Sequence, residues 1–147
     1  MKRLTLIDKA FLLKRTPLFN TLDLDLLLAI ADKLGAVHFD QGDYVFVANE
    51  EANRMYFITK GRVEIQTPSG EKICQLESGN FFGEESLFNN KQRAYAAFCP
   101  IDTQLLTLSR ANLYTIISEC PSVAVGFMQV YTAAVNFRPF KQSEKEK

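Results

Sequence analysis

The sequence of 147 residues predicts a mainly β fold, namely an antiparallel eight-stranded jelly-roll barrel with helices at its N-terminal and C-terminal ends. Two observations predict this class. The apolar residues are spaced for helices near both ends of the chain and for short strands between them. The strands also follow one another without intervening helices, which argues against a parallel sheet. The length fits one domain, which we place over 1–140, followed by a disordered tail over 141–147.

The N-terminal part, residues 4–34, has the spacing of helices. A short helix is predicted over 6–13. Asp23 is a suitable cap for a second helix, which Gly35 should end. The apolar residues of this second helix share one face: Leu27, Ile30, Ala31 and Leu34.

The period then changes to that of short strands separated by turn residues. Two strands are predicted over 94–98 and 104–108, with Pro100 between them as a turn former. The strands before these are predicted around pairs of apolar residues: Val37 and Phe39, Tyr44 and Phe46, Tyr56 and Ile58, Val63 and Ile65, and Ile73 and Leu76.

Helical spacing returns after the last strand. Ser109 is a suitable N-cap for one helix, and Pro121 fits the first turn of another. We place the core roll, together with the helix that precedes it, over 18–118. The C-terminal helix is placed over 119–138.

Charge and cysteine content restrict the function classes. The 17 Lys and Arg residues balance the 17 Asp and Glu residues, so we expect no direct binding of nucleic acid. The three cysteines show no CxxC spacing, which is typical of reduced thiols in a cytoplasmic protein. Asp8 and Lys9 interrupt the apolar start of the chain, so we expect no signal peptide. The uncharged stretch 120–137 contains polar residues, so we expect no membrane span.

The segment 79–94, between two groups of strands, has the properties of an anion site. Gly83 allows the backbone to approach a ligand, and the residues after it can form one helical turn whose free N–H groups point at a phosphate. Arg93 supplies a planar, permanently charged fork for phosphate oxygens. An ionised Glu84 can accept a hydrogen bond from a ribose hydroxyl.

The sequence Phe82-Gly83-Glu84, followed by Arg93, resembles the phosphate-binding cassette of cyclic-nucleotide-binding domains. Catabolite-activator-type regulators and kinase regulatory subunits are familiar members of that family. The resemblance covers about 18–130. It includes the ordered segments Leu18-Phe19 with Leu22, Gln41-Gly42-Asp43, and Tyr56 to Val63.

The resemblance implies a role for each matching residue. Gly83, Ser86 and their neighbours would give backbone N–H groups to the cyclic phosphate, and Arg93 would pair with its charge. Glu84 would hold the ribose 2′-OH. Ala94 stands where members that favour cyclic GMP carry a hydroxyl residue, so the implied ligand is cyclic AMP (cAMP). The candidate ligand-binding set in this segment is Phe82, Gly83, Glu84, Glu85, Ser86, Arg93 and Ala94.

Two residues depart from the family pattern. Glu85 stands where an apolar residue is usual. It would either repel the phosphate or lie at the surface, where it complements the positive end of a short helix. Tyr95 stands where a small residue is common, and it would either narrow the base pocket or face solvent.

Other kinds of site have less support. Arg93 could be an exposed strand residue in a weak surface pair with Glu84 or Glu85. His38 is the single histidine, so a metal site has no ligand set, and no GxSxG segment accompanies it. We therefore expect no metal and no enzymatic activity.

The C-terminal helix is apolar on more than one side, which favours contact with a second chain. Gly126 and Ala133 lie one heptad apart and would allow close approach of a partner helix, so we predict a homodimer. Thr132 and Asn136 are four residues apart and would offer hydrogen bonds to an adenine edge. Tyr131 or Phe137 would stack on the base. One side of the helix carries Val123, Phe127, Val130, Tyr131 and Ala134, and the other carries Val125, Met128 and Val135.

The function that follows is a non-enzymatic sensor or regulatory subunit for a cyclic nucleotide, with cAMP as the expected ligand. It would signal to a separate, unidentified protein, because we expect a stand-alone domain with neither a DNA-binding nor a catalytic domain. The alternative is an interaction module that keeps the fold and has lost nucleotide binding, for which Glu85 is the main clue.

Overall fold

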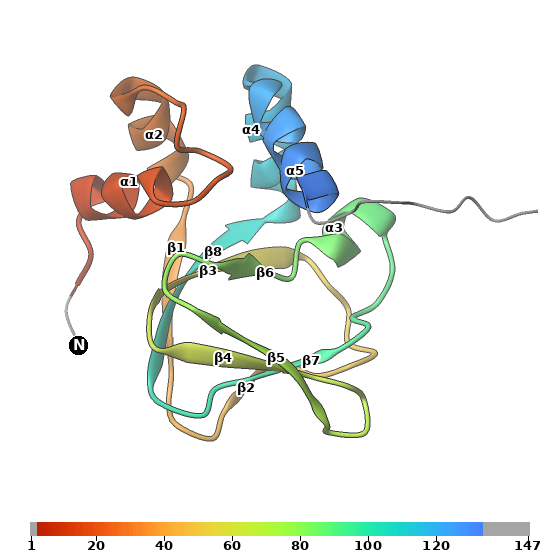
Figure 1. The fold of residues 1–147 in the computed structure, drawn as a ribbon. Coiled ribbons are helices and arrows are strands. Elements are labelled where there is room, and N and C mark those ends of the chain that lie inside the picture. Colours follow the sequence, from red (N-terminus) through yellow and green to blue (C-terminus); the bar gives the residue numbers. More distant parts are fainter. Residues whose placement is uncertain (1–2, 134–147) are drawn as a thin grey trace, which may run out of the picture.

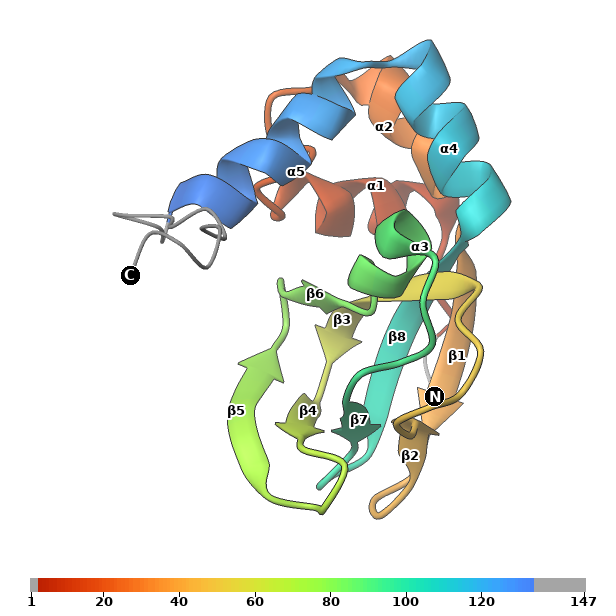
Figure 2. The same cartoon turned by 90° about the vertical axis from the view of Figure 1, so that its right-hand side faces the viewer.

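The computed structural model describes residues 3–133, and it is mainly β with flanking helices. Eight antiparallel strands form two four-stranded sheets. Figure 1 shows the helices from the two ends of the chain gathered at the same end of the sheets, and Figure 2 shows this from the side. The expected helices at both sequence ends are therefore confirmed, and they share one layer in space.

The first sheet has the order β1-β8-β3-β6 and the second has the order β2-β7-β4-β5. No ladder joins the two sheets in the described part of the chain, so the strands do not close into the single barrel that we expected. The first sheet contains β1 (Gly35–Phe39), β8 (Thr103–Ser109), β3 (Arg54–Lys60) and β6 (Phe81–Phe82). The second contains β2 (Tyr44–Phe46), β7 (Ala96–Phe98), β4 (Arg62–Gln66) and β5 (Lys72–Glu77).

The N-terminal helices are α1 (Leu6–Lys14) and α2 (Leu24–Ala31). The expected cap of α2 is confirmed, because the Asp23 side chain accepts from the backbone N–H of Leu26 at 3.0 Å. The expected end at Gly35 is wrong, since that glycine is the first residue of β1. A Cβ at this position would lie 2.8 Å from Thr107 Oγ1 on the paired strand β8, which explains the glycine.

The strand predicted over 94–98 begins only at Ala96. The backbone of Arg93 is held by the loop before β3, because its N–H donates to Glu50 O at 2.9 Å and its carbonyl accepts from Asn49 N at 2.7 Å. These bonds fix the approach of the chain to β7 and therefore the position of Arg93.

The C-terminal helices are α4 (Arg110–Glu119) and α5 (Ser122–Ala133). Ser109 caps α4 as predicted, since its hydroxyl accepts from Asn112 N at 3.1 Å. No single helix within residues 3–133 is both long and apolar enough to cross a membrane, although α4 and α5, bent by 109°, meet the length and hydropathy criteria as a pair.

The face of α5 toward the core carries Val123 and Phe127. Gly126 is also buried, and a Cβ there would lie 3.3 Å from the carbonyl oxygen of Leu18. The expectation that Gly126 adjoins the helix of a second copy is therefore wrong, because its own chain covers it. Of the predicted helix 119–138, the positions Asn136 and Phe137 lie outside the described residues, as does the tail 141–147.

Two apolar clusters make up the core. The larger one joins the helices to the first sheet, where Phe81 packs edge-on against Phe127 of α5 with ring centroids 5.8 Å apart. The smaller cluster lies between the two sheets and contains Phe46, Tyr56, Ile58, Val63, Ile65, Phe82, Ala97, Cys99 and Leu105. The candidate site lies where these two clusters meet.

Candidate functional site

The segment that was expected to bind an anion connects the two sheets. It runs from β6 through Gly83 into the short helix α3 (Glu85–Asn89), and then to Arg93 and β7. Figure 2 shows α3 between the strands and α5. Gly83 has a φ of +87°, and a Cβ there would lie 3.0 Å from Arg93 Nη1. Both the backbone conformation and the close approach of the guanidinium therefore require glycine.

Arg93 is buried, with 4% of its surface exposed. Its Nη1 donates to the carbonyl of Gly83 and its Nη2 to the carbonyl of Arg54, both at 2.6 Å. The guanidinium carbon also lies 4.0 Å from the centroid of the Phe46 ring, a cation–π contact. The alternative of an exposed arginine in a surface ion pair is therefore wrong. Burial lowers the pKa of Arg93, and a guanidinium still remains charged.

Glu84 is the buried carboxylate of the site, also with 4% of its surface exposed. Its Oε2 accepts a hydrogen bond of 2.7 Å from the hydroxyl of Tyr131. Burial, and then the charge of Glu85, raise the pKa of Glu84 to about 7, while the Tyr131 hydrogen bond and Arg93 oppose this rise. Glu84 is therefore a carboxyl group that changes its charge near neutral pH.

Two buried polar atoms of this site have no partner among the residues that the structure describes. They are Glu84 Oε1, an acceptor, and Arg93 Nε, a donor. Buried polar groups without a hydrogen bond are rare in folded proteins, because each carries a desolvation penalty of about 1 to 3 kcal/mol. The two atoms would be satisfied by a ligand that offers a donor to Glu84 and an acceptor to Arg93.

The two departures from the family pattern contact each other. The N–H of Gly83 donates to the hydroxyl of Tyr95 at 3.1 Å, and that hydroxyl donates to Glu85 Oε1 at 2.8 Å. The Tyr95 hydroxyl is therefore hydrogen-bonded within the chain and does not point to solvent. It accepts a hydrogen bond from the Gly83 N–H, the group that was expected to bind phosphate. Burial, followed by Glu85, raises the pKa of Tyr95, so the phenol stays protonated.

The remaining candidate residues are Tyr131 and Thr132 on α5, and Phe82, Ser86 and Ala94 in the 79–94 segment. Tyr131 reaches the site from α5, but through its hydroxyl on Glu84. Thr132 is exposed, and its hydroxyl donates to Met128 O of its own helix at 2.8 Å. Phe82 is a core residue that stacks on Tyr56 with ring centroids 5.2 Å apart. Ser86 is buried at the start of α3, and Ala94 is exposed beside Arg93.

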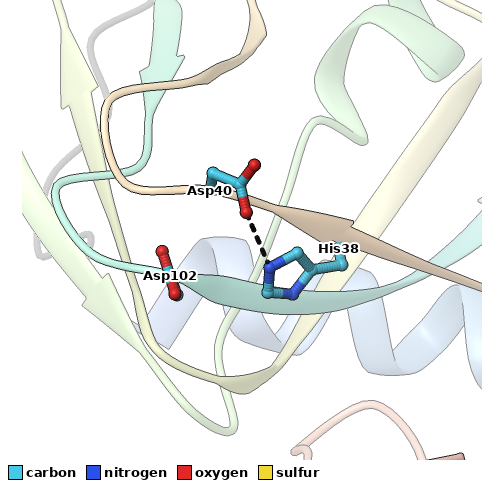
Figure 3. Close-up of side chains that lie close together, drawn as sticks. All are labelled: His38, Asp40 and Asp102. Atoms are coloured by element: carbon cyan, nitrogen blue, oxygen red, sulfur yellow. Dashed lines mark hydrogen bonds and ion pairs between the residues drawn. The ribbon is translucent and has the colours of Figure 1, made fainter. Parts of the chain in front are cut away.

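A second cluster of polar side chains lies where β1 ends and β8 begins (Figure 3). Potential ligand atoms of His38, Asp40 and Asp102 all lie within 4.8 Å of one another, although the sequence suggested no partner for His38. His38 Nε2 pairs with Asp40 Oδ1 at 3.1 Å, and Asp102 accepts from the N–H of Gln41 at 2.8 Å. All three side chains are exposed. These bonds explain the cluster, because they connect the turn after β1 to the turn before β8.

Comparisons with known proteins identify the family. The sequence model of the cyclic nucleotide-binding domain matches residues 36–120. Potassium/sodium hyperpolarization-activated cyclic nucleotide-gated channel 2 of Mus musculus is 31% identical over 114 residues, which is 78% of this chain and 13% of the channel. A cGMP-dependent protein kinase isozyme of Drosophila melanogaster is 34% identical over 118 residues, which is 76% of this chain and 13% of the kinase. This chain thus spans a small part of these relatives.

Solved structures share the fold. The catabolite activator protein of Thermus thermophilus superposes with a TM-score of 0.74 and 25% identity, over 80% of this chain and 57% of that protein. The regulatory domain of Toxoplasma gondii PKA, solved with cAMP, superposes with a TM-score of 0.75 and 18% identity, over 86% of this chain and 49% of that one. At the latter identity, the likeness concerns the fold alone.

Proposed function

This chain belongs to the cyclic nucleotide-binding domain family, and from that premise we propose that it is a non-enzymatic sensor of a cyclic nucleotide, with cAMP as the ligand. The family is regulatory and generally without catalytic activity. The observation that carries the proposal is the pair of unpartnered buried atoms, Glu84 Oε1 and Arg93 Nε.

These two atoms are complementary to a ribose cyclic phosphate. A ribose hydroxyl is a donor and suits the carboxylate oxygen of Glu84, whereas a phosphate oxygen is an acceptor and suits Arg93 Nε. The two existing bonds of Arg93 to carbonyl oxygens hold the guanidinium in place while Nε stays available. A single ligand that reached both atoms would remove both desolvation penalties.

The proposed ligand set is that of the family resemblance, with α5 as the second wall. Glu84 and Arg93 carry the polar contacts, and Ser86 offers its backbone N–H from the first turn of α3, where N–H groups lack intrahelical acceptors. Ala94 brings no hydroxyl group, which supports cAMP over cyclic GMP. Tyr131 would leave Glu84 to stack on the base. The proposed set is Phe82, Gly83, Glu84, Glu85, Ser86, Arg93, Ala94, Tyr131, Thr132 and Asn136, of which Asn136 lies outside the described residues.

The proposed output is contact with another polypeptide, and a homodimer through α5 is the first candidate. Val125 and Met128 stand on the side of α5 away from the core, with 46% and 56% of their surfaces exposed. Sedimentation of the wild type and of Met128→Lys tests this directly. A dimer that the lysine abolishes supports the proposal, and a wild type that stays monomeric with and without ligand removes it.

A second candidate function is an interaction module without nucleotide binding. The specific observation in its favour is that the chain itself occupies two groups of the site. Tyr131 bonds to Glu84, and Tyr95 bonds to the N–H of Gly83.

A thermal-shift panel with cAMP, cyclic GMP and cyclic dinucleotides separates the two functions. A ligand at about 100 times its dissociation constant adds about 2.7 kcal/mol to the free energy of unfolding. The 2′-deoxy analogue of cAMP is the matched control, because it keeps the phosphate and lacks the donor for Glu84. Stabilisation by cAMP that the analogue fails to match supports the sensor, and no stabilisation by any of these ligands supports the interaction module.

A further inference from the structure

Glu85 and Tyr95 form one hydrogen-bonded unit on the cassette. The Tyr95 hydroxyl accepts from Gly83 N at 3.1 Å and donates to Glu85 Oε1 at 2.8 Å. Arg93 Nη1 donates to the carbonyl oxygen of the same glycine at 2.6 Å. The backbone N–H and the carbonyl of Gly83 are thus both hydrogen-bonded within the chain, to the side chains of Tyr95 and Arg93, which are two residues apart in sequence.

The aromatic ring of Tyr95 is positioned by the core. It packs against Phe46 with ring centroids 5.5 Å apart, and the guanidinium of Arg93 lies over the same Phe46 ring at 4.0 Å. The phenol ring of Tyr95 and the guanidinium of Arg93 therefore both pack against Phe46, and this places the two side chains beside each other. Its other partner, Glu85, is an exposed residue at the start of α3.

This unit presents the kinds of group that an anionic ligand would present. The hydroxyl oxygen accepts a cassette N–H, as a phosphate oxygen would, and the carboxylate adds a negative charge that interacts with Arg93. An exposed carboxylate needs no partner for its own stability, because water solvates it well. The bond from Tyr95 instead keeps the charge of Glu85 next to the cassette.

We propose that Tyr95 and Glu85 act as an internal competitor for the anionic ligand, so that the pair must open before a phosphate reaches the N–H of Gly83. This inference rests on the proposed function and adds a determinant of affinity to it. The hydrogen bonds of the pair stabilise the ligand-free domain, and the same bonds are lost when the ligand takes their place. The affinity of the site is therefore set partly by residues that the ligand displaces.

Two variants test the pair. Tyr95→Phe removes the hydroxyl and keeps the ring on Phe46, and Glu85→Gln removes the charge of an exposed residue, so the fold is retained. We expect each variant to bind cAMP roughly threefold to tenfold more tightly than the wild type, from the net value of one hydrogen bond. The double variant should gain less than the product of the two single gains, because both remove the same unit.

Two matched controls accompany them. Tyr44→Phe removes a hydroxyl that donates to Gln66 at 3.2 Å, and Glu77→Gln removes a carboxylate that accepts from Gln75 at 2.9 Å. Neither of these side-chain bonds involves a residue of the 79–94 cassette, so both control variants should bind cAMP with the affinity of the wild type. A second readout is the melting temperature without ligand, which the Tyr95→Phe change should lower. A lower melting temperature together with tighter binding distinguishes a competitor from a purely structural tie.

The outcomes separate this inference from the proposed function. If the wild type and both variants bind cAMP equally, or the variants bind more weakly, the competitor is overturned while the sensor function stands. If the variants bind and the wild type does not, the competitor is supported and the wild-type chain is not a sensor under those conditions. If none of the proteins binds a cyclic nucleotide, both are overturned.

Discussion

The hydroxyl of Tyr131 on α5 donates a hydrogen bond of 2.7 Å to Glu84 Oε2 in the cassette, across 47 positions of sequence. This bond joins the last described helix to the one buried carboxylate of the candidate site. Burial and Glu84 raise the pKa of Tyr131, so its phenol remains the donor throughout the physiological range. The charge of Glu84 and the placement of α5 are consequently coupled.

The first prediction concerns pH. The pKa of Glu84 is about 7 in the folded chain against an ordinary 4.5, so the folded state binds more protons than the unfolded state between these values. The free energy of unfolding should therefore fall as pH rises from about 5 to 8, by about 3 kcal/mol at most. Urea unfolding of the wild type and of Glu84→Gln at several pH values measures this. The glutamine should remove this part of the slope, whereas Glu77→Gln should keep it; a slope equal in all three proteins contradicts the assignment.

The second prediction concerns the link to α5. Tyr131→Phe removes the hydroxyl that donates to Glu84 Oε2 and should lower the free energy of unfolding by about 1 to 3 kcal/mol. The loss should be larger at pH 8 than at pH 5.5, because the ionised carboxylate gains more from a donor. Tyr114→Phe is the matched control. Tyr114 is exposed to nearly the same extent as Tyr131, and its hydroxyl donates to Leu87 O at 2.6 Å, a group that does not titrate. A loss for Tyr131→Phe that is independent of pH would show that the hydroxyl does not act on the charge of Glu84.

The third prediction concerns Gly83. Gly83→Ala should cost about 1 to 2 kcal/mol for the left-handed backbone and a further amount for the contact with Arg93 Nη1. Gly79→Ala has a similar φ of +97° with open space around the Cβ, so it measures the backbone cost alone. Chemical denaturation of both variants gives the difference. Equal losses would mean that the guanidinium moves aside freely, which its two short bonds to carbonyl oxygens argue against.

The fourth prediction separates packing from association. Gly126→Leu should destabilise the chain by about 1 to 3 kcal/mol, because the new side chain meets the backbone of Leu18. Val125→Leu, at the exposed neighbouring position, should change the free energy of unfolding little. Denaturation at two protein concentrations provides the check. An undiminished stability of Gly126→Leu would place this face of α5 away from Leu18.

The sequence predicted elements that show either a helical period or a short apolar run bounded by turn residues. In α2, Leu27 and Ile30 face the core as their spacing indicated, and in β3 the apolar run from Met55 to Ile58 is buried as a strand. The strand β6 was not predicted, because its two residues are too few to show a period. The division into two sheets was also not predictable, because local spacing does not specify which strands pair.

The candidate site was predicted only where its residues are close in sequence. Gly83, Glu84 and Arg93 were identified together, and the structure brings them together. The bonds from Tyr131 to Glu84 and from Tyr95 to Glu85 depend on the packing of α5 and of Phe46, and no local pattern contains that information. The carbonyl of Arg54 was missed for a further reason, since backbone acceptors leave no trace in residue types.

The two carbonyl contacts of Arg93 have an entropic consequence for any anion that binds there. A free arginine side chain loses about 1.5 to 2 kcal/mol of rotamer freedom when it is immobilised. The bonds from Arg93 to Gly83 O and Arg54 O impose that loss during folding, before an anion arrives. An anion that binds at Nε therefore meets a guanidinium that is already ordered. Its binding entropy should lack the unfavourable contribution that a mobile surface arginine adds.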